Sequence, residues 1–207
     1  ITLIDGLFVG EMIVLSKAYP KTKPRNVIPF YPVDKETSEP ITPLTKRIRV
    51  TRNGSFAPNE DEYSSKDLIP KESASLELPD APEFCKETLT MKKYEKEGYI
   101  LLIAKRDLKD AFRQIPLRHT EWLFSVYKIL GIYIIDTMDS YGLRSASKHC
   151  QEVGLLIIMT FKIWVKPKLK GKEAISIKVY IDDYAIWIRA KSVERAKEIL
   201  ALFDKYQ

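Results

Sequence analysis

The sequence predicts an α+β domain in which helices pack on one face of an antiparallel sheet. In the second half of the chain, short apolar runs alternate with segments of helical periodicity, in the order strand–helix–hairpin–helix–strand–strand–helix. Two of these runs, residues 175–180 and 184–188, are separated by adjacent aspartates, which are poor strand residues and indicate a hairpin turn. At 207 residues the chain can bury a sizeable core, as one large domain or two small subdomains.

Composition and charge indicate a globular protein with a polyanionic partner. Hydrophobic residues make up 45% and charged residues 30% of the chain, which is ordinary for a soluble domain. The net charge is +6 and the pI is about 9.1, so an anionic partner such as nucleic acid is favoured. The charge is uneven: residues 15–52 hold nine Lys or Arg against three acids, whereas residues 53–80 hold two lysines against seven acids.

The numbers of cysteines and histidines and the hydropathy pattern argue against a disulfide-rich secreted protein, a zinc protein and a membrane protein. Two cysteines do not make a disulfide framework, and two histidines leave little for a zinc site. No apolar run is long enough to span a bilayer, and the first residues do not resemble a signal peptide. We therefore expect an intracellular protein, in the nucleus or the cytoplasm, with no membrane partner.

The N-terminal half is predicted to hold two strands and a long loop. Residues 12–15 and 26–31 are expected to pair as a basic hairpin, for which a merely solvated charged hairpin is the alternative. The cations of this hairpin are Lys17, Lys21, Lys23 and Arg25. Prolines at positions 29, 32, 40 and 43 favour an edge strand followed by extended chain. Residues 53–80 are typical of a long surface loop.

A capped helix and a buried strand are predicted next. Asp80 is suited to cap the start of the helix, and Gly98 is suited to end it. Residues 99–104 form a continuous apolar run, which predicts a central strand. This strand leads to Asp107, at the kind of strand end where proteins commonly present functional groups. Residues 108–115 should then turn helical.

The remaining elements are a hairpin and two helices. Residues 122–127 and 133–136 predict the hairpin, and a polar segment at 141–147 leads into the first helix. Helical spacing predicts that this helix buries Cys150, Val153, Ile157, Phe161 and Trp164. A lysine-rich connection, residues 166–172, leads to the aspartate hairpin, and an amphipathic helix is expected over residues 192–206.

Three aspartates are the candidate metal ligands. Asp182 and Asp183 lie in the predicted turn and Asp107 lies at a strand end, so the three carboxylates meet if the strands are neighbours. Fixed carboxylates suit a hard divalent cation such as Mg²⁺. Clustered aspartates that hold two metals about 3.5–4 Å apart catalyse phosphoryl transfer between nucleotides, because one ion activates the attacking hydroxyl and the other steadies the leaving pyrophosphate. For the adjacent pair taken alone, a plain aspartate-rich turn is the alternative.

Four motifs, in matching order, resemble those of reverse transcriptases. The run Tyr180-Ile181-Asp182-Asp183 is similar to their Tyr-x-Asp-Asp box, and residues 107–116 resemble their first palm motif. Residues 141–146, Tyr-Gly-Leu-Arg-Ser-Ala, resemble their Phe-Gly-Leu-x-Ser-Ala motif. Residues 23–28 are similar to the fingers strand that holds a triphosphate-binding arginine. The resemblance covers about residues 10–206 and looks most like retrotransposon enzymes of the LTR or tyrosine-recombinase type.

The resemblance implies a right-hand polymerase fold and its activity. It implies a fingers subdomain over residues 1–98 and a palm over residues 99–207, with the thumb absent from this chain. The implied activity is that of an RNA-directed DNA polymerase, a template-directed nucleotidyl transfer with two Mg²⁺ ions, or Mn²⁺ in their place. The implied partners are a primed RNA or DNA template and dNTPs, with further domains or a protein partner supplying the thumb.

The resemblance also assigns roles to individual residues. Asp107, Asp182 and Asp183 would hold the metals together with the backbone of Leu108. Phe112 would be the steric gate that leaves no room for a 2′-hydroxyl, with a core aromatic as the alternative. The other implied nucleotide contacts are Lys17, Arg25, Asp110, Ala111, Tyr141 and Gly142.

Departures from the motifs leave other functions open. Asp139-Ser140 replaces a usual Leu-Pro pair, Ser147 replaces a common proline, and Pro29 and Tyr31 replace the usual Asp and Arg of the fingers strand. These changes spare the metal ligands, but the resemblance implies that they fall at positions that handle the template. One alternative is a domesticated, non-polymerising domain that binds nucleic acid or protein. Another is a different palm-type nucleotidyl transferase, such as an RNA-templated RNA polymerase, against which Phe112 argues.

Overall fold

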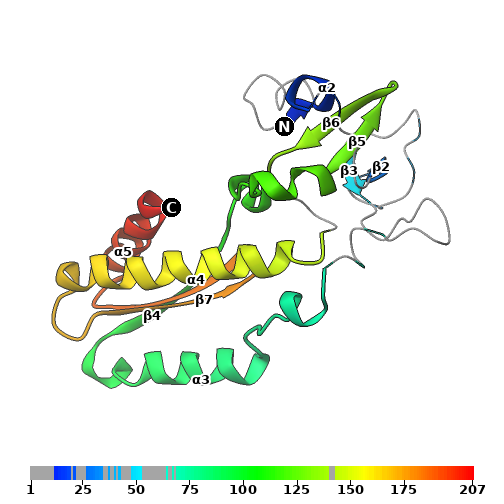
Figure 1. The fold of residues 1–207 in the computed structure, drawn as a ribbon. Helices are drawn as coiled ribbons and strands as arrows, with labels where there is room; N and C mark the ends of the chain where they lie inside the picture. The colour runs from blue at the N-terminus through cyan, green and yellow to red at the C-terminus, as the bar shows by residue number, and fades with distance from the viewer. Residues whose placement is uncertain are drawn as a thin grey trace. The chain divides into compact units, whose positions relative to one another are not determined.

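The computed structural model divides the chain into two compact units, each built from two stretches of sequence (Figure 1). Residues 1–75 and 112–147 make the first unit, and residues 76–111 and 148–207 make the second. The structure describes residues 12–19, 21, 27–34, 37, 40, 42, 48–52, 64, 67, 69–139 and 143–207. Within these residues, no helix is long and apolar enough to cross a membrane.

A three-stranded antiparallel sheet organises the first unit. Its strand order is β1 (Met12–Val14), β6 (Ile132–Asp136), β5 (Val126–Ile129). The β5–β6 hairpin is confirmed, and it turns through Leu130 and Gly131, which have φ values of 48° and 82° as a type I′ turn requires. The short helix α2 (Leu15–Ala18) follows β1, and its Leu15 packs against buried residues of β5 and β6.

The predicted hairpin of residues 12–31 is wrong, because β1 pairs with β6 instead. The register places Ile13 opposite Ile135, so the apolar face of β1 extends an apolar sheet. Residue Val27 forms only an isolated bridge to Val126. The proline-containing strand is present as β2 (Phe30–Asp34), but it pairs with a strand that the sequence did not predict, β3 (Ile48–Arg52).

Segments of 3₁₀-helix replace two predicted elements. The helix expected over residues 108–115 is reduced to Ala111–Gln114. Asp110, just before it, has a φ of 51°, which right-handed helix does not allow. The first part of the predicted strand 122–127 lies in a second 3₁₀ segment, His119–Phe124. The described residues hold three further such turns: Glu72–Ala74 in the second half of the predicted loop, Glu95–Glu97 after the capped helix, and Lys166–Lys168 in the lysine-rich connection.

The second unit is built on a three-stranded antiparallel sheet. Its strand order is β4 (Ile100–Asp107), β8 (Asp183–Ala190), β7 (Ala174–Tyr180). The sequence predicts β4 as a central strand, but it is an edge strand and β8 is central. The reason is visible in the burial pattern. Alternate residues of β4 are exposed, whereas most of β8 is buried on both faces.

Helices cover both faces of this sheet, not one as predicted. On one face, α4 (Ala146–Val165) and α5 (Val193–Tyr206) bury the aromatic residues Phe161, Tyr184 and Phe203. On the opposite face, α3 (Ala81–Lys92) packs against Trp187, which donates a 2.8 Å hydrogen bond to Thr88. Asp80 caps α3 as predicted, because its side chain accepts a hydrogen bond from the Glu83 amide.

The buried face of α4 is rotated from the predicted one. Cys150 and Phe161 are buried as expected, but Val153 is 36% and Trp164 is 39% exposed. The buried stripe instead runs through Gly154 and Ile158. A Cβ added at Gly154 would lie 2.8 Å from Cγ2 of Val179, so the absence of a side chain there lets α4 close onto β7. The sequence pattern missed this because a glycine adds nothing to an apolar face.

We predict that Gly154→Ala destabilises the second unit by about 1–3 kcal/mol, because overpacking outweighs the gain in helix propensity. Urea denaturation of the single and double variants measures the effect. In a Val179→Ala background the 2.8 Å contact is removed and only the 3.3 Å contact with the Tyr184 hydroxyl remains, so Gly154→Ala should there cost much less. An equal loss of stability in both backgrounds would show that the contact between α4 and β7 is not the cause.

Candidate metal centre

The turn between β7 and β8 presents two aspartates from a strained backbone. Asp183 is the first residue of β8 and pairs with Tyr180, which leaves Ile181 and Asp182 as a two-residue loop. Ile181 has a φ of 62°, and Asp182 does not share this positive φ, as in a type II′ turn. Glycine is the usual residue there. A β-branched side chain in this region costs on the order of 1–3 kcal/mol, so neighbouring groups must hold the turn.

Hydrogen bonds from α4 and from the end of β4 hold this turn. The buried amide side chain of Gln151 accepts a 2.7 Å hydrogen bond from the Ile181 amide and donates a 3.1 Å hydrogen bond to the Val179 carbonyl. The amide of Leu108 donates a 3.0 Å hydrogen bond to the Asp182 carbonyl. The backbone before the aspartate pair and the carbonyl between the two aspartates are therefore held in place.

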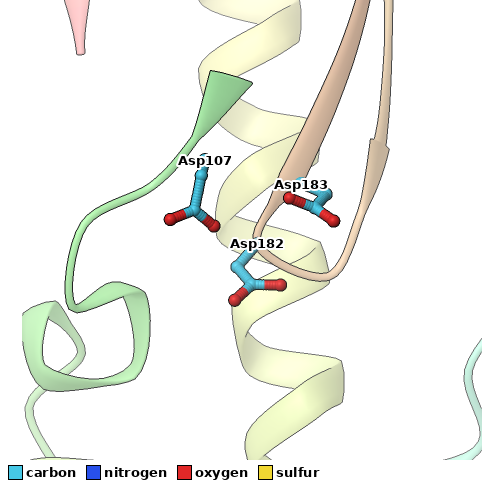
Figure 2. Close-up of side chains that lie close together, drawn as sticks. All are labelled: Asp107, Asp182 and Asp183. Atoms are coloured by element: carbon cyan, nitrogen blue, oxygen red, sulfur yellow. The ribbon is translucent and has the colours of Figure 1, made fainter. Parts of the chain in front are cut away.

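The pairing of β4 with β8 brings the third aspartate to the turn. Asp107 is the last residue of β4, and its Cα partner in the register is Asp183. One carboxylate oxygen from each of Asp107, Asp182 and Asp183 lies within 4.8 Å of the others (Figure 2). Asp107 is exposed and the other two are half-buried. The predicted meeting of the three carboxylates is confirmed.

A lysine shares the exposed face of β4 with Asp107. Lys105 lies two residues before Asp107, and its Nζ is 2.8 Å from Oδ2 of Asp183. The hydrogen bond to Asp183 raises the pKa of Lys105, and the charges of Asp183, Asp107 and Asp182 raise it further. Of the ion pairs recorded among the described residues, this is the one that touches the cluster, so a metal ion must compete with Lys105 for one oxygen of Asp183.

The cluster fits a divalent cation in ligand type and spacing. Mg²⁺ prefers oxygen ligands at about 2.0–2.1 Å, so ligands on opposite sides of an ion are about 4.2 Å apart. One carboxylate oxygen from each of the three aspartates lies within 4.8 Å of the others, so small rotations of these side chains bring the oxygens to that spacing. Arg106 steadies the end of β4, because its guanidinium makes hydrogen bonds of 2.6 and 2.9 Å to Asp204 of α5. This pair is partly exposed, so it orients the strand more than it stabilises the fold.

The other predicted site residues are only partly described. Lys17 is an exposed residue of α2, and Asp110 is exposed in the turn after β4. Ala111 and Phe112 are buried, each 3% exposed, and burial of Phe112 is what its alternative role as a core aromatic requires. Arg25, Tyr141 and Gly142 lie outside the described residues. The nucleotide-binding roles of all these residues stay predictions.

Sequence reasoning missed two residues that shape the cluster. Lys105 was detectable, because strand alternation places it on the same face as Asp107. Gln151 was detectable only as a polar residue between Cys150 and the apolar face of α4, since nothing in the sequence pairs it with residues 30 positions away.

Comparison with solved structures shows that the chain has a reverse-transcriptase-like fold. It aligns over 99% of its length with the native prototype foamy virus protease-reverse transcriptase, at a TM-score of 0.58 and 12% identity. Two complexes of the foamy viral protease-reverse transcriptase with double-stranded DNA align at TM-scores of 0.56 and 0.53, with 15% and 14% identity. The chain spans 21%, 33% and 27% of these three chains. No protein-family model and no curated protein matches the chain by sequence.

We predict that Gln151→Leu weakens metal binding about 10–100-fold, because the residue orients the turn that presents Asp182 and Asp183. The measurement is Mn²⁺ affinity by electron paramagnetic resonance, with urea denaturation to record the accompanying loss of stability. Glu152→Gln, an exposed change one position along α4, is the matched control and should leave Mn²⁺ affinity unaltered. Wild-type affinity in a folded Gln151→Leu protein would contradict the positioning role.

Proposed function

We propose that the chain contains the catalytic centre of an RNA-directed DNA polymerase, which transfers nucleotides with two divalent cations. The observation that carries the proposal is the register of β4 and β8, which places Asp107 opposite Asp183 beside the turn holding Asp182. The reverse-transcriptase-like fold supports the same reaction class. The retrotransposon type, LTR or tyrosine-recombinase, rests on the sequence motifs.

The residues of the chain divide the work of such a reaction. Asp107, Asp182 and Asp183 would hold Mg²⁺, together with the Leu108 carbonyl. Bound there, the ions would activate the primer 3′-hydroxyl and neutralise the leaving pyrophosphate. Gln151 keeps the backbone of the turn in place, so that only the carboxylate side chains need to rotate when the ions bind.

The predicted residues outside the aspartate cluster would bind the nucleotide. Lys17 and Arg25 would neutralise the triphosphate, as cationic clamps do in phosphoryl transfer. The backbone at Asp110 and Ala111 would face the triphosphate, and Phe112 would pack under the sugar. Tyr141 and Gly142 would lie against the incoming nucleotide and the template base. In this proposal residues 1–98 act mainly as fingers and residues 99–207 mainly as palm.

A domesticated, non-polymerising module is the second candidate. The departures at Pro29, Tyr31, Asp139, Ser140 and Ser147 favour it, since they change positions that would handle template. The intact aspartate cluster weighs against it, because a binding module has no use for three converging carboxylates. The two candidates differ in whether removing one carboxylate abolishes a measurable reaction.

Asp182→Asn should lower nucleotide incorporation on the order of a thousandfold or more, because a metal contributes several kcal/mol of charge stabilisation in the transition state. Primer extension on an RNA template with Mg²⁺ and dNTPs, using the full-length protein, measures the loss. Asp80→Asn is the matched control, because asparagine keeps the cap of α3 and removes the same charge elsewhere. Incorporation by Asp182→Asn at the wild-type rate would remove the cluster from the reaction.

Phe112→Val should raise the use of ribonucleotides relative to deoxynucleotides on the order of a hundredfold in kcat/KM, because the smaller side chain leaves room for a 2′-hydroxyl. Single-nucleotide incorporation of dNTP and rNTP measures the ratio, alongside thermal melting. Phe203→Val, a buried aromatic of α5, is the control that should lower stability without altering sugar choice. Unchanged sugar choice with a large fall in melting temperature would establish Phe112 as core packing.

A further inference from the structure

A concentration of cations lies at the end of the second-unit sheet opposite to the aspartates. The register of β4 and β8 runs from Ile100 opposite Ala190 to Asp107 opposite Asp183. Seven residue steps along a strand span about 23 Å. The chain segments at the Ile100 end are residues 93–97, 166–172 and 189–191, and together they hold eight Lys or Arg against two glutamates.

Two tyrosines gather four of these cations into what we call the distal basic cluster, defined by Lys93, Lys172, Arg189 and Lys191. The ring centroid of Tyr94 lies 4.6 Å from Nζ of Lys172, 4.4 Å from Cζ of Arg189 and 5.8 Å from Nζ of Lys93. Nζ of Lys191 lies 4.0 Å from the ring centroid of Tyr99. Cation–π contacts of this kind hold long side chains in place without neutralising their charge.

Hydrogen bonds to the backbone fix the same side chains. Arg189 donates a 2.7 Å hydrogen bond to the carbonyl of Lys172, and Lys191 donates a 2.7 Å hydrogen bond to the carbonyl of Glu97. The backbone amide of Lys172 donates to the hydroxyl of Tyr99. Because these side chains are already ordered, an anion that binds them loses less conformational entropy on their behalf.

Local carboxylates do not balance this charge. Glu97 makes a 2.7 Å ion pair with Lys172, which uses one of the three donors of that ammonium group. Glu173, which directly follows Lys172, is paired with Arg195, whose hydrogen bond lowers the pKa of Glu173. The distal basic cluster therefore keeps an excess of fixed positive charge on an exposed surface, as a phosphate-binding surface requires.

We propose that the distal basic cluster binds the phosphodiester backbone of nucleic acid, as a second contact surface about 23 Å from the metal centre. The inference rests on the proposed function for the identity of the polyanion, because a polymerase substrate is long enough to reach both surfaces. At 3.4 Å per nucleotide along one strand, a backbone that follows the sheet reaches this surface about seven nucleotides from the reacting end. The surface adds affinity without contacting the reacting atoms.

The test compares two pairs of lysine substitutions. Lys172→Gln/Lys191→Gln removes two charges from the cluster, and Lys86→Gln/Lys205→Gln removes two charges from exposed positions outside it. Binding of a fluorescent 20-base-pair DNA duplex is measured by anisotropy over a range of salt concentrations. We expect the cluster variant to lose about tenfold in affinity and about 1.8 from the slope of log K against log salt, at about 0.9 per phosphate contact. The control variant should change affinity by less than about twofold.

Equal losses in both variants, or no loss in the cluster variant, would overturn the proposal. If the cluster variant is misfolded by melting, Lys93→Gln, which removes only the longest of the cation–π contacts, replaces it and should still lower the salt slope by about 0.9. Vesicles of phosphatidylserine and phosphatidylcholine provide the remaining comparison. Vesicle binding that is lost in the cluster variant while DNA binding is unchanged would assign the surface to a membrane.

The duplex assay separates this inference from the proposed function. A wild-type protein that binds DNA through the cluster but extends no primer would contradict the polymerase and leave the second surface standing. A protein that still extends primers and binds DNA at wild-type affinity after the cluster is neutralised would contradict the second surface and leave the polymerase standing.

Discussion

The antiparallel pairing of β4 with β8 is the constraint on which the candidate site depends. A shift of one residue in this register would move Asp107 away from Asp183 and send every side chain of β4 to the opposite face. The register is held by burial, because Tyr184, Ile186 and Ile188 of β8 are covered by α4 and α5 while Trp187 packs under α3. The apolar core therefore determines where the charged groups meet.

The turn at Ile181 adds a second constraint, which works against local backbone preference. A β-branched residue at a φ of 62° persists because Gln151 and Leu108 hydrogen-bond the backbone on both sides. Gly154, one turn further along α4, lets the helix come close enough for Gln151 to reach the turn. Lys105 then relieves repulsion within the carboxylate cluster. Helix packing, the strained turn and the Lys105 ion pair thus together position Asp107, Asp182 and Asp183.

The aspartate hairpin was predictable because its signal is local: two apolar runs flank a carboxylate pair. The cap at Asp80 and the end of β4 at Asp107 were predictable for the same reason. The pairing of strands that lie far apart in the sequence was not predictable. The pairing of β1 with β6 rather than with residues 26–31, and the edge position of β4, depend on contacts between apolar faces that lie 76 or more residues apart in the chain. The strained φ of Ile181 and its support by Gln151 leave no trace in residue periodicity.

Locating Mn²⁺ in crystals tests whether Asp107, Asp182 and Asp183 together form a divalent-cation centre. Anomalous scattering from crystals soaked in Mn²⁺ and a dNTP should give density between the three carboxylates, about 2.1 Å from oxygens of Asp107 and Asp182. Mn²⁺ bound elsewhere at saturating concentration, with the ion pair of Lys105 and Asp183 undisturbed, would show that the three aspartates do not form a cation site.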